Sequence, residues 1–201
     1  MLLAQGISLN RSNKVIFEDT NLSLNPGKVI VLKGKNGSGK TTFIKTLLNI
    51  LEPTKGNIYW KGKIVKKNLY DFYNNTTYIA DKTSSIRQLS VNENIELWKH
   101  FSLSKIKVSQ INSILDMLNL NNYKNKKVSS LSMGEIKKLE LLRLILENKK
   151  IWILDEPLAN LDNESIGVLI QTFNDHCENN GSIIFSSHQK IEFINNEEIL
   201  F

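Results

Sequence analysis

The chain alternates between short apolar runs and stretches in which apolar residues recur at helical spacing. Apolar runs of roughly four to eight residues bounded by turn residues are typical of strands, whereas apolar residues three and four apart mark one face of a helix. The run at 29–32 is entirely apolar, which predicts a strand buried on both faces. In chain order the pattern predicts strands at 2–9, 15–24 and 29–32, a helix at 40–51, strands at 56–62 and 76–80, a helical segment at 90–120, a helix at 133–147, a strand at 151–154, a helix at 163–177 and a strand at 182–185.

Strands that alternate with helices in this way favour a largely parallel sheet with helices on both faces. Ser90 and Glu93, three residues apart before an apolar segment, predict a capping box at the start of the middle helical segment. No internal repeat, low-complexity tract or long linker interrupts the chain. We therefore expect an α/β fold over residues 1–201 as a single domain, in which residues about 85–130 form a small inserted helical lobe.

Composition excludes some functions without selecting one. No apolar run approaches the roughly 20 residues needed to span a bilayer, so the chain is not itself a channel. The N-terminus lacks the basic start and long apolar stretch of a secretory signal, so we expect a cytoplasmic protein. Cys177 is the single cysteine, which excludes an internal disulfide framework, and we expect a packing or surface role for it.

The net charge of +6 raises nucleic acid and anionic membrane surfaces as partners. The lysines are scattered, however, and no RNA-binding motif or interleaved aromatic pattern accompanies them, so we expect a solvated surface and no nucleic acid partner. Two local clusters are the exceptions, and either can face phospholipid headgroups: Lys61, Lys63, Lys66 and Lys67, and the run Lys124 to Lys127.

A glycine-rich loop carries the strongest chemical signal. Its glycines let backbone N–H groups turn inward around phosphate oxygens, and the helix that follows adds the positive end of its dipole. Lys40 supplies a point charge to the β- and γ-phosphates, and Thr41 supplies a hydroxyl to Mg²⁺. The predicted strand before the loop and the helix after it are the required context, so we predict binding of ATP with Mg²⁺. The nucleotide-binding residues of this loop are Gly34, Lys35, Asn36, Gly37, Ser38, Gly39, Lys40, Thr41 and Thr42.

Two adjacent carboxylates follow the apolar strand at 151–154, at the edge where ligands of open α/β sheets bind. Asp155 is placed to hold Mg²⁺ and Glu156 to polarise the attacking water, because phosphoryl transfer needs positioning, charge neutralisation and an oriented nucleophile. An acidic pair alone is more often a solvated strand end. Its place downstream of a phosphate-binding loop favours an ATPase in which Glu156 is catalytic.

The sequence Leu131-Ser132-Met133-Gly134-Glu135 precedes the acidic strand, and with it the chain resembles the ATP-binding subunits of ABC transporters over nearly its whole length. The resemblance implies a P-loop NTPase core of the RecA-like type with an N-terminal antiparallel β part. It also implies that residues 132–135 meet the γ-phosphate of ATP held by a second copy, in a head-to-tail dimer. Ser132 and Gly134 can offer donors at a helix start, although Ser132 with Glu135 alone reads as an ordinary capping box.

Two further elements of the same family follow in order. Ala159-Asn160-Leu161-Asp162 resembles the loop that lies between facing subunits, and Asp162 is its acidic residue. His188 resembles the switch histidine that contacts the γ-phosphate and orients catalytic groups, so the resemblance implies a catalytic role for it. His100 and His176 have no such placement, and we expect both at the surface.

Some positions depart from the family's pattern. Lys82 stands where the family usually has a glutamine that contacts Mg²⁺ and senses the membrane partner, and an ammonium cannot ligate a cation. Either the neighbouring Asp81 takes over the metal contact or coupling is weakened. Met133 and Glu135 replace the commoner Gly and Gln, and we expect the carboxylate of Glu135 to point away from the phosphate and cap its own helix. Arg11 stands near the place of an adenine-stacking tyrosine, either as a stacking guanidinium or as a plain surface arginine.

The resemblance extends to a subfamily. The stretches 56–60 and 152–157, Arg11 and the compact length resemble the ATP-binding subunit of the haem exporter complex of cytochrome c maturation. This implies integral membrane permease subunits as partners, a peripheral place on the cytoplasmic face of the inner membrane, and no direct haem binding. The alternatives are the ATPase of another ABC exporter or importer, a soluble ABC protein acting on nucleic acid, and a binding module that does not hydrolyse ATP.

Overall fold

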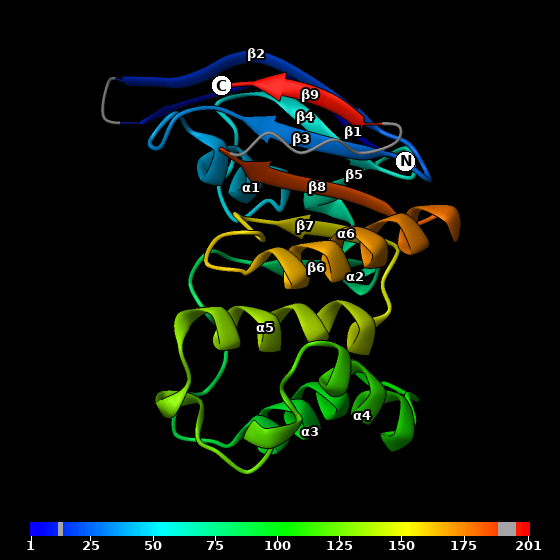
Figure 1. Ribbon diagram of the computed structural model, residues 1–201. Coiled ribbons are helices and arrows are strands. Elements are labelled where there is room, and N and C mark those ends of the chain that lie inside the picture. Colours follow the sequence, from blue (N-terminus) through cyan, green and yellow to red (C-terminus); the bar gives the residue numbers. More distant parts are fainter. Residues whose placement is uncertain (12–13, 189–195) are drawn as a thin grey trace.

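The computed structural model describes residues 1–11, 14–188 and 196–201 (Figure 1). Short 3₁₀ turns lie at Val65–Lys67, Asn121–Tyr123 and Val128–Ser130. In chain order the strands and helices are β1 (Leu2–Arg11), β2 (Lys14–Leu24), β3 (Val29–Lys33), α1 (Lys40–Leu47), β4 (Lys55–Trp60), β5 (Lys63–Ile64), α2 (Leu69–Asn74), β6 (Thr76–Ile79), α3 (Val91–Ser102), α4 (Val108–Met117), α5 (Met133–Glu147), β7 (Ile151–Leu154), α6 (Asn163–Glu178), β8 (Ser182–Ser187) and β9 (Asn196–Leu200).

The strands of the described residues form two sheets. An antiparallel sheet has the order β2-β1-β4-β5, and a parallel sheet has the order β6-β7-β8-β3-β9. The predicted α/β fold with an N-terminal antiparallel part is therefore confirmed. Because β3 and β7 run in the same direction with β8 between them, the loop after β3 and the acidic pair after β7 meet at one edge of the sheet.

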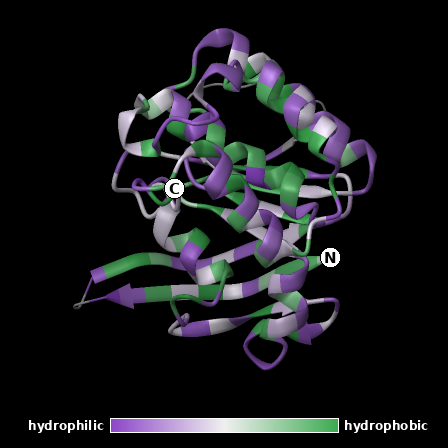
Figure 2. Ribbon diagram, turned by 90° about the horizontal axis from the view of Figure 1, so that it is seen from below, coloured by the Kyte–Doolittle hydropathy of each residue, from purple (hydrophilic) through white to green (hydrophobic). Residues whose placement is uncertain are grey.

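The core follows from the alternation of side chains along the parallel strands. Ile30, Leu32 and Ile184 point to one face, where they pack with α1 and the antiparallel sheet. Val31 and Phe185 point to the other face, where they pack with residues of α5 and α6. Both faces are covered, which explains why the strands read as unbroken apolar runs. Figure 2 shows the hydrophobic stretches in the middle of the molecule and mixed colouring along the outer helices.

A separate apolar cluster holds α3 and α4 against α5, which lies between these two helices and the parallel sheet (Figure 1). The predicted capping box is confirmed at the start of α3: the Ser90 hydroxyl accepts from Glu93 N, and the Glu93 carboxylate accepts from Ser90 N. We call α3, α4 and the turns up to residue 130 the helical lobe. It therefore touches the rest of the molecule largely through the helix that begins at Met133.

The structure corrects the bounds of one helix and adds elements that the sequence pattern missed. The predicted helix 40–51 is too long, since α1 ends at Leu47. Asn49 adopts a left-handed φ of 54°, which a right-handed helix cannot contain, and Leu51 N donates to Lys45 O in a terminal turn. The missed elements are α2, the two-residue β5, and β9, which pairs with β3 at the edge of the parallel sheet.

The prediction that His176 lies at the surface is wrong. Its ring stacks on Trp152 at a centroid distance of 3.6 Å and an interplanar angle of 5°, and Gly181 lies so close that a Cβ there would come within 2.2 Å of His176 Nε2. Helical spacing did not show this contact because Trp152 comes from β7, on the neighbouring sheet. Burial lowers the pKa of His176 to about 4, since the charged ring is disfavoured there. Burial likewise raises the pKa of Cys177 to about 11, which agrees with a packing role.

The stability of the fold should therefore fall at mildly acidic pH. The unfolded chain binds a proton at His176 near pH 6.5 and the folded chain only near pH 4, so acid favours the unfolded state as the pH falls between these values. His176→Phe keeps an aromatic ring on Trp152 and removes the titration. We expect a shallower decrease of the melting temperature from pH 7 to pH 4 in this variant, and an unchanged decrease in the matched control His100→Phe, whose histidine is exposed. Parallel curves for His176→Phe and the parent chain would contradict the assignment.

Candidate nucleotide site

The loop between β3 and α1 has the geometry of an anion cradle. Gly37 and Gly39 have φ values of 80° and 109°, which turn the backbone in a way that residues with a Cβ rarely follow. Gly39 is also the N-cap of α1, and no side chain accepts a hydrogen bond from the first turn of the helix, so its N–H groups face the cleft with the positive end of the dipole. Lys40 is buried at 6% exposure, and its ammonium donates to Gly34 O at 2.8 Å and Lys35 O at 3.2 Å.

The carboxylates after β7 lie beside this loop. Asp155 is 1% exposed, and its Oδ2 is buried without a hydrogen-bond partner, while its Oδ1 accepts from Ser186 Oγ at 2.7 Å. Glu156 has a left-handed φ of 47°, and its Oε1 lies 3.8 Å from Lys40 Nζ. Its Oε2 lies 3.0 Å from His188 Nδ1. Because an ionised carboxylate can only accept, Nδ1 carries the proton of this bond whenever Glu156 is charged.

A cleft of about 450 Å³ lies between the loop, Glu156 and His188. Of the residues predicted to bind the nucleotide or the metal ion, those that do not line it are Arg11, Gly34, Lys35, Ser38 and Asp155. Arg11 ends β1 and is exposed. Ile16 and Ala159 line it too. The sequence pattern placed Ala159 only in the loop between facing subunits, and it missed Ile16 because this apolar side chain belongs to no motif. The lining residues are Ile16, Asn36, Gly37, Gly39, Lys40, Thr41, Thr42, Asp81, Glu156, Ala159 and His188.

The site fits a hard divalent cation shared with a phosphate. Such an ion takes oxygen ligands, and the buried, unpartnered Oδ2 of Asp155 is an oxygen of this kind. Thr41 adds a hydroxyl on the wall of the cleft. Within the described residues no group of three or more His, Cys, Asp and Glu side chains is arranged to hold a metal ion by itself. Phosphate oxygens would therefore supply a large part of the ion's shell.

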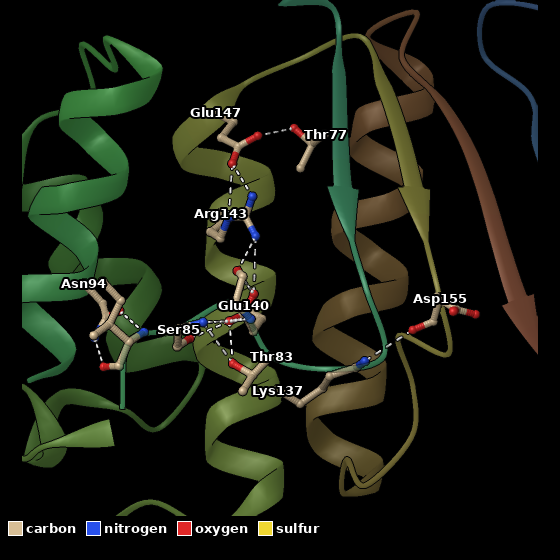
Figure 3. Close-up of polar contacts among 11 residues, drawn as sticks. Thr77, Thr83, Ser85, Asn94, Lys137, Glu140, Arg143, Glu147 and Asp155 are labelled. Carbon is tan, nitrogen blue, oxygen red and sulfur yellow. Dashed lines mark hydrogen bonds and ion pairs between the residues drawn. The ribbon is translucent and has the colours of Figure 1, made fainter. Parts of the chain in front are cut away.

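Asp81 and Lys82, which follow β6, differ in the hollows of the surface that they line. Asp81 lines the nucleotide cleft and also a second hollow of about 520 Å³, whereas Lys82 lines only the second. Lys137 on α5 is buried in the wall of that second hollow and donates to Asp155 O at 3.4 Å (Figure 3). Burial lowers the pKa of Lys137, although Asp81 and Asp155 oppose the shift. Asp81, and not Lys82, thus lines the cleft together with the phosphate loop.

The N-terminus of α5 lies outside the nucleotide cleft of its own chain. Ser132 and Glu135 form a reciprocal capping box, with Ser132 N donating to Glu135 Oε2 at 2.7 Å, which confirms that Glu135 caps its own helix. Hydrogen bonds from Tyr123 and Ser132 outweigh burial and lower the pKa of Glu135. Met133 is 64% exposed at the tip of the helix. A Cβ on Gly134 would come within 2.7 Å of Asn160 O, so only glycine allows this close approach.

Asp162 connects the same region to α6. It is the N-cap of α6, where its Oδ1 accepts from Ser165 N at 2.8 Å and from Ser165 Oγ at 2.7 Å, and its Oδ2 accepts from Lys138 Nζ at 3.0 Å. These hydrogen bonds and the lysine hold the pKa of Asp162 well below its ordinary value. The loop at 159–162 is therefore held against α5, which begins at Met133.

Comparisons with known proteins agree with this geometry. The model of the ABC transporter family matches residues 17–159. A cytochrome c biogenesis ATP-binding export protein of Reclinomonas americana is 34% identical over 189 residues, covering 92% of this chain and 84% of the relative. A protein of the same description from Vibrio vulnificus is 30% identical, covering 94% of this chain and 92% of the relative.

Solved structures show the same fold. The ATP-binding protein of a putative ABC transporter from Pyrococcus furiosus superposes with a TM-score of 0.84 at 25% identity, covering 98% of this chain and 96% of that one. A dimeric ATP-binding cassette in a post-hydrolysis state, bound to ADP and Pi, has a TM-score of 0.80 at 20% identity and covers 94% of this chain and 88% of that one. In the described part of the chain, every helix is too short or too polar to be a candidate membrane span.

Proposed function

We propose that this chain, because it belongs to the ABC transporter family, is the ATP-binding subunit of an exporter used in cytochrome c biogenesis, of the haem exporter type. It is an ABC-type ATPase, and it supplies the ATP-driven part of a membrane transporter. The proposal of this exporter rests on the description shared by the relatives from Reclinomonas americana and Vibrio vulnificus, which match along nearly the whole chain.

The geometry supports a division of labour for hydrolysis. The N–H groups of the loop and Lys40 bind the phosphates, and Thr41 with Oδ2 of Asp155 would hold Mg²⁺. When bound, Mg²⁺ neutralises charge that develops on the phosphates. Glu156 orients and polarises the attacking water, and His188, which is 3.0 Å from its carboxylate, holds that carboxylate in place. Ile16 offers the base or ribose an apolar surface at the outer wall of the cleft.

We propose that the second half of the site comes from another copy of the chain. Residues 132–135 lie outside the chain's own nucleotide cleft, and Met133 leaves the tip of α5 exposed. A head-to-tail dimer would bring this helix N-terminus, with its positive dipole end, against the γ-phosphate held by the other copy. The post-hydrolysis cassette that shares the fold is itself dimeric. ATP would then join two copies, and its hydrolysis would release them.

Asp81 is our candidate for the metal contact that Lys82 cannot make, because only Asp81 lines the nucleotide cleft. We expect Asp81→Ala to raise the Mg²⁺ concentration for half-maximal ATPase activity by about tenfold, in line with the loss of one charge-assisted contact. The matched change Lys82→Ala should leave this concentration unchanged. Phosphate release measured across a Mg²⁺ titration tests both variants, and a normal curve for Asp81→Ala would remove Asp81 from the site.

The permease identifies the transporter, so its capture is the direct test of the proposed export function. A tagged chain carrying Glu156→Gln is purified from native membranes with Mg-ATP, and co-purifying proteins are identified by mass spectrometry. We expect integral membrane subunits of a cytochrome c biogenesis exporter, to which this chain binds peripherally at the cytoplasmic face of the inner membrane. Recovery of an importer's permease in their place would contradict the export proposal and leave the ATPase assignment intact.

We propose further that neither haem nor nucleic acid binds this subunit directly. The nucleotide cleft is lined by phosphate-binding groups, and the histidine that it contains, His188, is engaged with Glu156. Titration of the purified chain with haemin should give no saturable shift of the Soret band. A stoichiometric shift abolished by His188→Ala would overturn this part of the proposal.

A further inference from the structure

Ser186 occupies the position on β8 that faces the acidic pair. In the parallel pairing of β7 with β8, Leu154 is in register with Phe185. Asp155 and Ser186 directly follow these two residues, so they lie side by side. Ser186 is fully buried, at 0% exposure. On its other side β8 pairs with β3, where Ser186 is in register with Leu32, two residues before Gly34. The side chain therefore sits between the two parts of the nucleotide site.

The hydroxyl of Ser186 makes two hydrogen bonds of defined direction. It accepts from Glu156 N at 2.8 Å, and it lies 2.7 Å from Asp155 Oδ1. Because the backbone N–H can only donate and a hydroxyl has one proton, that proton must point to Asp155. The bond occupies Oδ1 and leaves Oδ2 as the buried oxygen without a partner. Ser186 thus decides which oxygen of Asp155 is available to a cation.

The second bond acts on the backbone of Glu156. This residue has a left-handed φ of 47°, a conformation that is unfavourable for a residue with a side chain and persists only where neighbours enforce it. The bond from Glu156 N to Ser186 Oγ is one such restraint. In this conformation the carboxylate reaches both His188, at 3.0 Å, and Lys40, at 3.8 Å.

We infer that Ser186 is a positioning residue for ATP hydrolysis: one hydroxyl orients the metal-binding oxygen of Asp155 and the backbone of Glu156 together. The inference rests on the roles proposed above for these two residues. Ser186 does more than satisfy the hydrogen bonds of a buried hydroxyl, because both of its partners, Asp155 and Glu156, belong to the proposed reaction machinery. The geometry of neither partner is set by its own strand alone.

Ser186→Ala removes both bonds without adding bulk, and Ser186→Thr restores the hydroxyl. The matched control is Ser182→Ala at the opposite end of the same strand, where another buried hydroxyl donates to Asn25 O at 2.9 Å, far from the nucleotide cleft. All variants are compared with the parent chain for melting temperature, for phosphate release, and for the affinity of a fluorescent ATP analogue in EDTA and across a Mg²⁺ titration.

We expect Ser186→Ala to lower kcat roughly tenfold and to raise the Mg²⁺ concentration that half-saturates tight nucleotide binding by a similar factor, as the loss of one hydrogen bond to a charged group implies. Affinity in EDTA should be unchanged, and Ser186→Thr should recover most of both effects. Ser182→Ala should lower the melting temperature as much as Ser186→Ala does, with normal kcat and Mg²⁺ dependence.

Normal Mg²⁺ dependence in Ser186→Ala, or an equal change in Ser182→Ala, would overturn the inference. If Ser186→Ala does not fold, Ser186→Thr and Ser186→Cys decide, since cysteine is a weak donor and should show the Mg²⁺ defect while threonine does not. Asp155→Asn and Glu156→Gln are measured in parallel. Should these two remain fully active, the site assignment itself fails, whereas inactivity of both with normal Ser186→Ala behaviour removes only the role of Ser186.

Discussion

Glu156→Gln should lower ATP hydrolysis by about 10²- to 10⁴-fold, the range for losing a general base or water-orienting carboxylate, while ATP continues to bind. The substitution keeps the size of the side chain and its reach toward His188 and Lys40, which lie 3.0 and 3.8 Å from the carboxylate oxygens. It removes the negative charge that would polarise a water. Phosphate release at saturating Mg-ATP measures the loss, and equilibrium binding of a labelled nucleotide shows that the cleft is intact.

The same variant should accumulate as a dimer when ATP is present. Because hydrolysis no longer separates the two copies, ATP stays between the cradle of one and the α5 N-terminus of the other. Analytical ultracentrifugation should show a monomer without nucleotide and a dimer with Mg-ATP. Lys40→Ala in the same background should abolish the ATP-dependent dimer, since it removes the buried cation of the cradle. A species that stays monomeric at saturating Mg-ATP would contradict the shared site.

The exposed tip of α5 offers a second, independent control. Met133 is 64% exposed and outside the nucleotide cleft of its own chain, so a bulky charged residue there need not disturb ATP binding in the monomer. In the dimer the same side chain would face the other copy. Glu156→Gln combined with Met133→Glu should therefore bind ATP normally and dimerise poorly, which separates binding from association.

The geometry of the candidate site could be predicted from the sequence where it depends on neighbouring residues of the chain. The loop 34–41 needs one strand before it and one helix after it, and all three are contiguous, so their geometry follows from spacing. Asp155 and Glu156 follow the same logic, because a buried strand ends directly before them. The capping box of Ser132 and Glu135 is local too, and it is present as expected.

Contacts between distant segments could not be predicted in this way. Ser186 bonds to a carboxylate 31 residues away, and His176 stacks on a ring from another element. Phe201 N donates to Lys33 O, and a Cβ on Gly34 would come within 2.6 Å of Phe201 O, so a residue distant in sequence limits the phosphate loop. The contacts of Ser186 and Phe201 depend on strand order, which places β8 beside β7 and β9 beside β3, and the contact of His176 depends on the packing of α6 on β7. Apolar runs predict where strands lie in the chain but not which strands are neighbours in the sheet.

Glu140 makes several further contacts between distant segments. It lies on α5 at 3% exposure and accepts hydrogen bonds from Thr83, Ser84 and Ser85, from side-chain hydroxyls of all three and from backbone N–H groups of the last two (Figure 3). Arg143 pairs with it at 3.3 Å. Burial raises the pKa of Glu140, but the hydrogen bonds and Arg143 outweigh burial, so the net shift is downward.

The segment at 83–86 is thereby attached to helices on two sides. Glu140 holds its first three residues from α5, and Asn94 of α3, which is fully buried, both donates to Ile86 O at 3.1 Å and accepts from Ile86 N at 2.8 Å. This segment directly follows Asp81 and Lys82. A displacement of α5 by a partner copy would therefore be passed to Asp81, at the edge of the nucleotide cleft.

Glu140→Ala should destabilise the fold by about 1–3 kcal/mol, because it leaves the buried Ser85 hydroxyl without its acceptor, whereas Arg143 keeps its ion pair with Glu147. Urea unfolding measures the change. Glu140→Gln should be intermediate, since one amide oxygen replaces two charged ones. The matched control is Glu96→Ala, which also removes a glutamate paired with a cation three residues along its helix, but an exposed one. There the expected cost is below about 1 kcal/mol.

Hydrogen exchange distinguishes the local release of residues 83–86 from a general loss of stability. In Glu140→Ala we expect amide exchange at residues 83–86 to accelerate under conditions where the strands of the parallel sheet stay protected, because Ser84 N loses its acceptor and Ser85 N keeps only Thr83 Oγ1. The Mg²⁺ requirement should rise with it, since Asp81 is released with the segment. Uniformly faster exchange across the sheet, with residues 83–86 no faster than the rest, would show that Glu140 stabilises the molecule without holding Asp81.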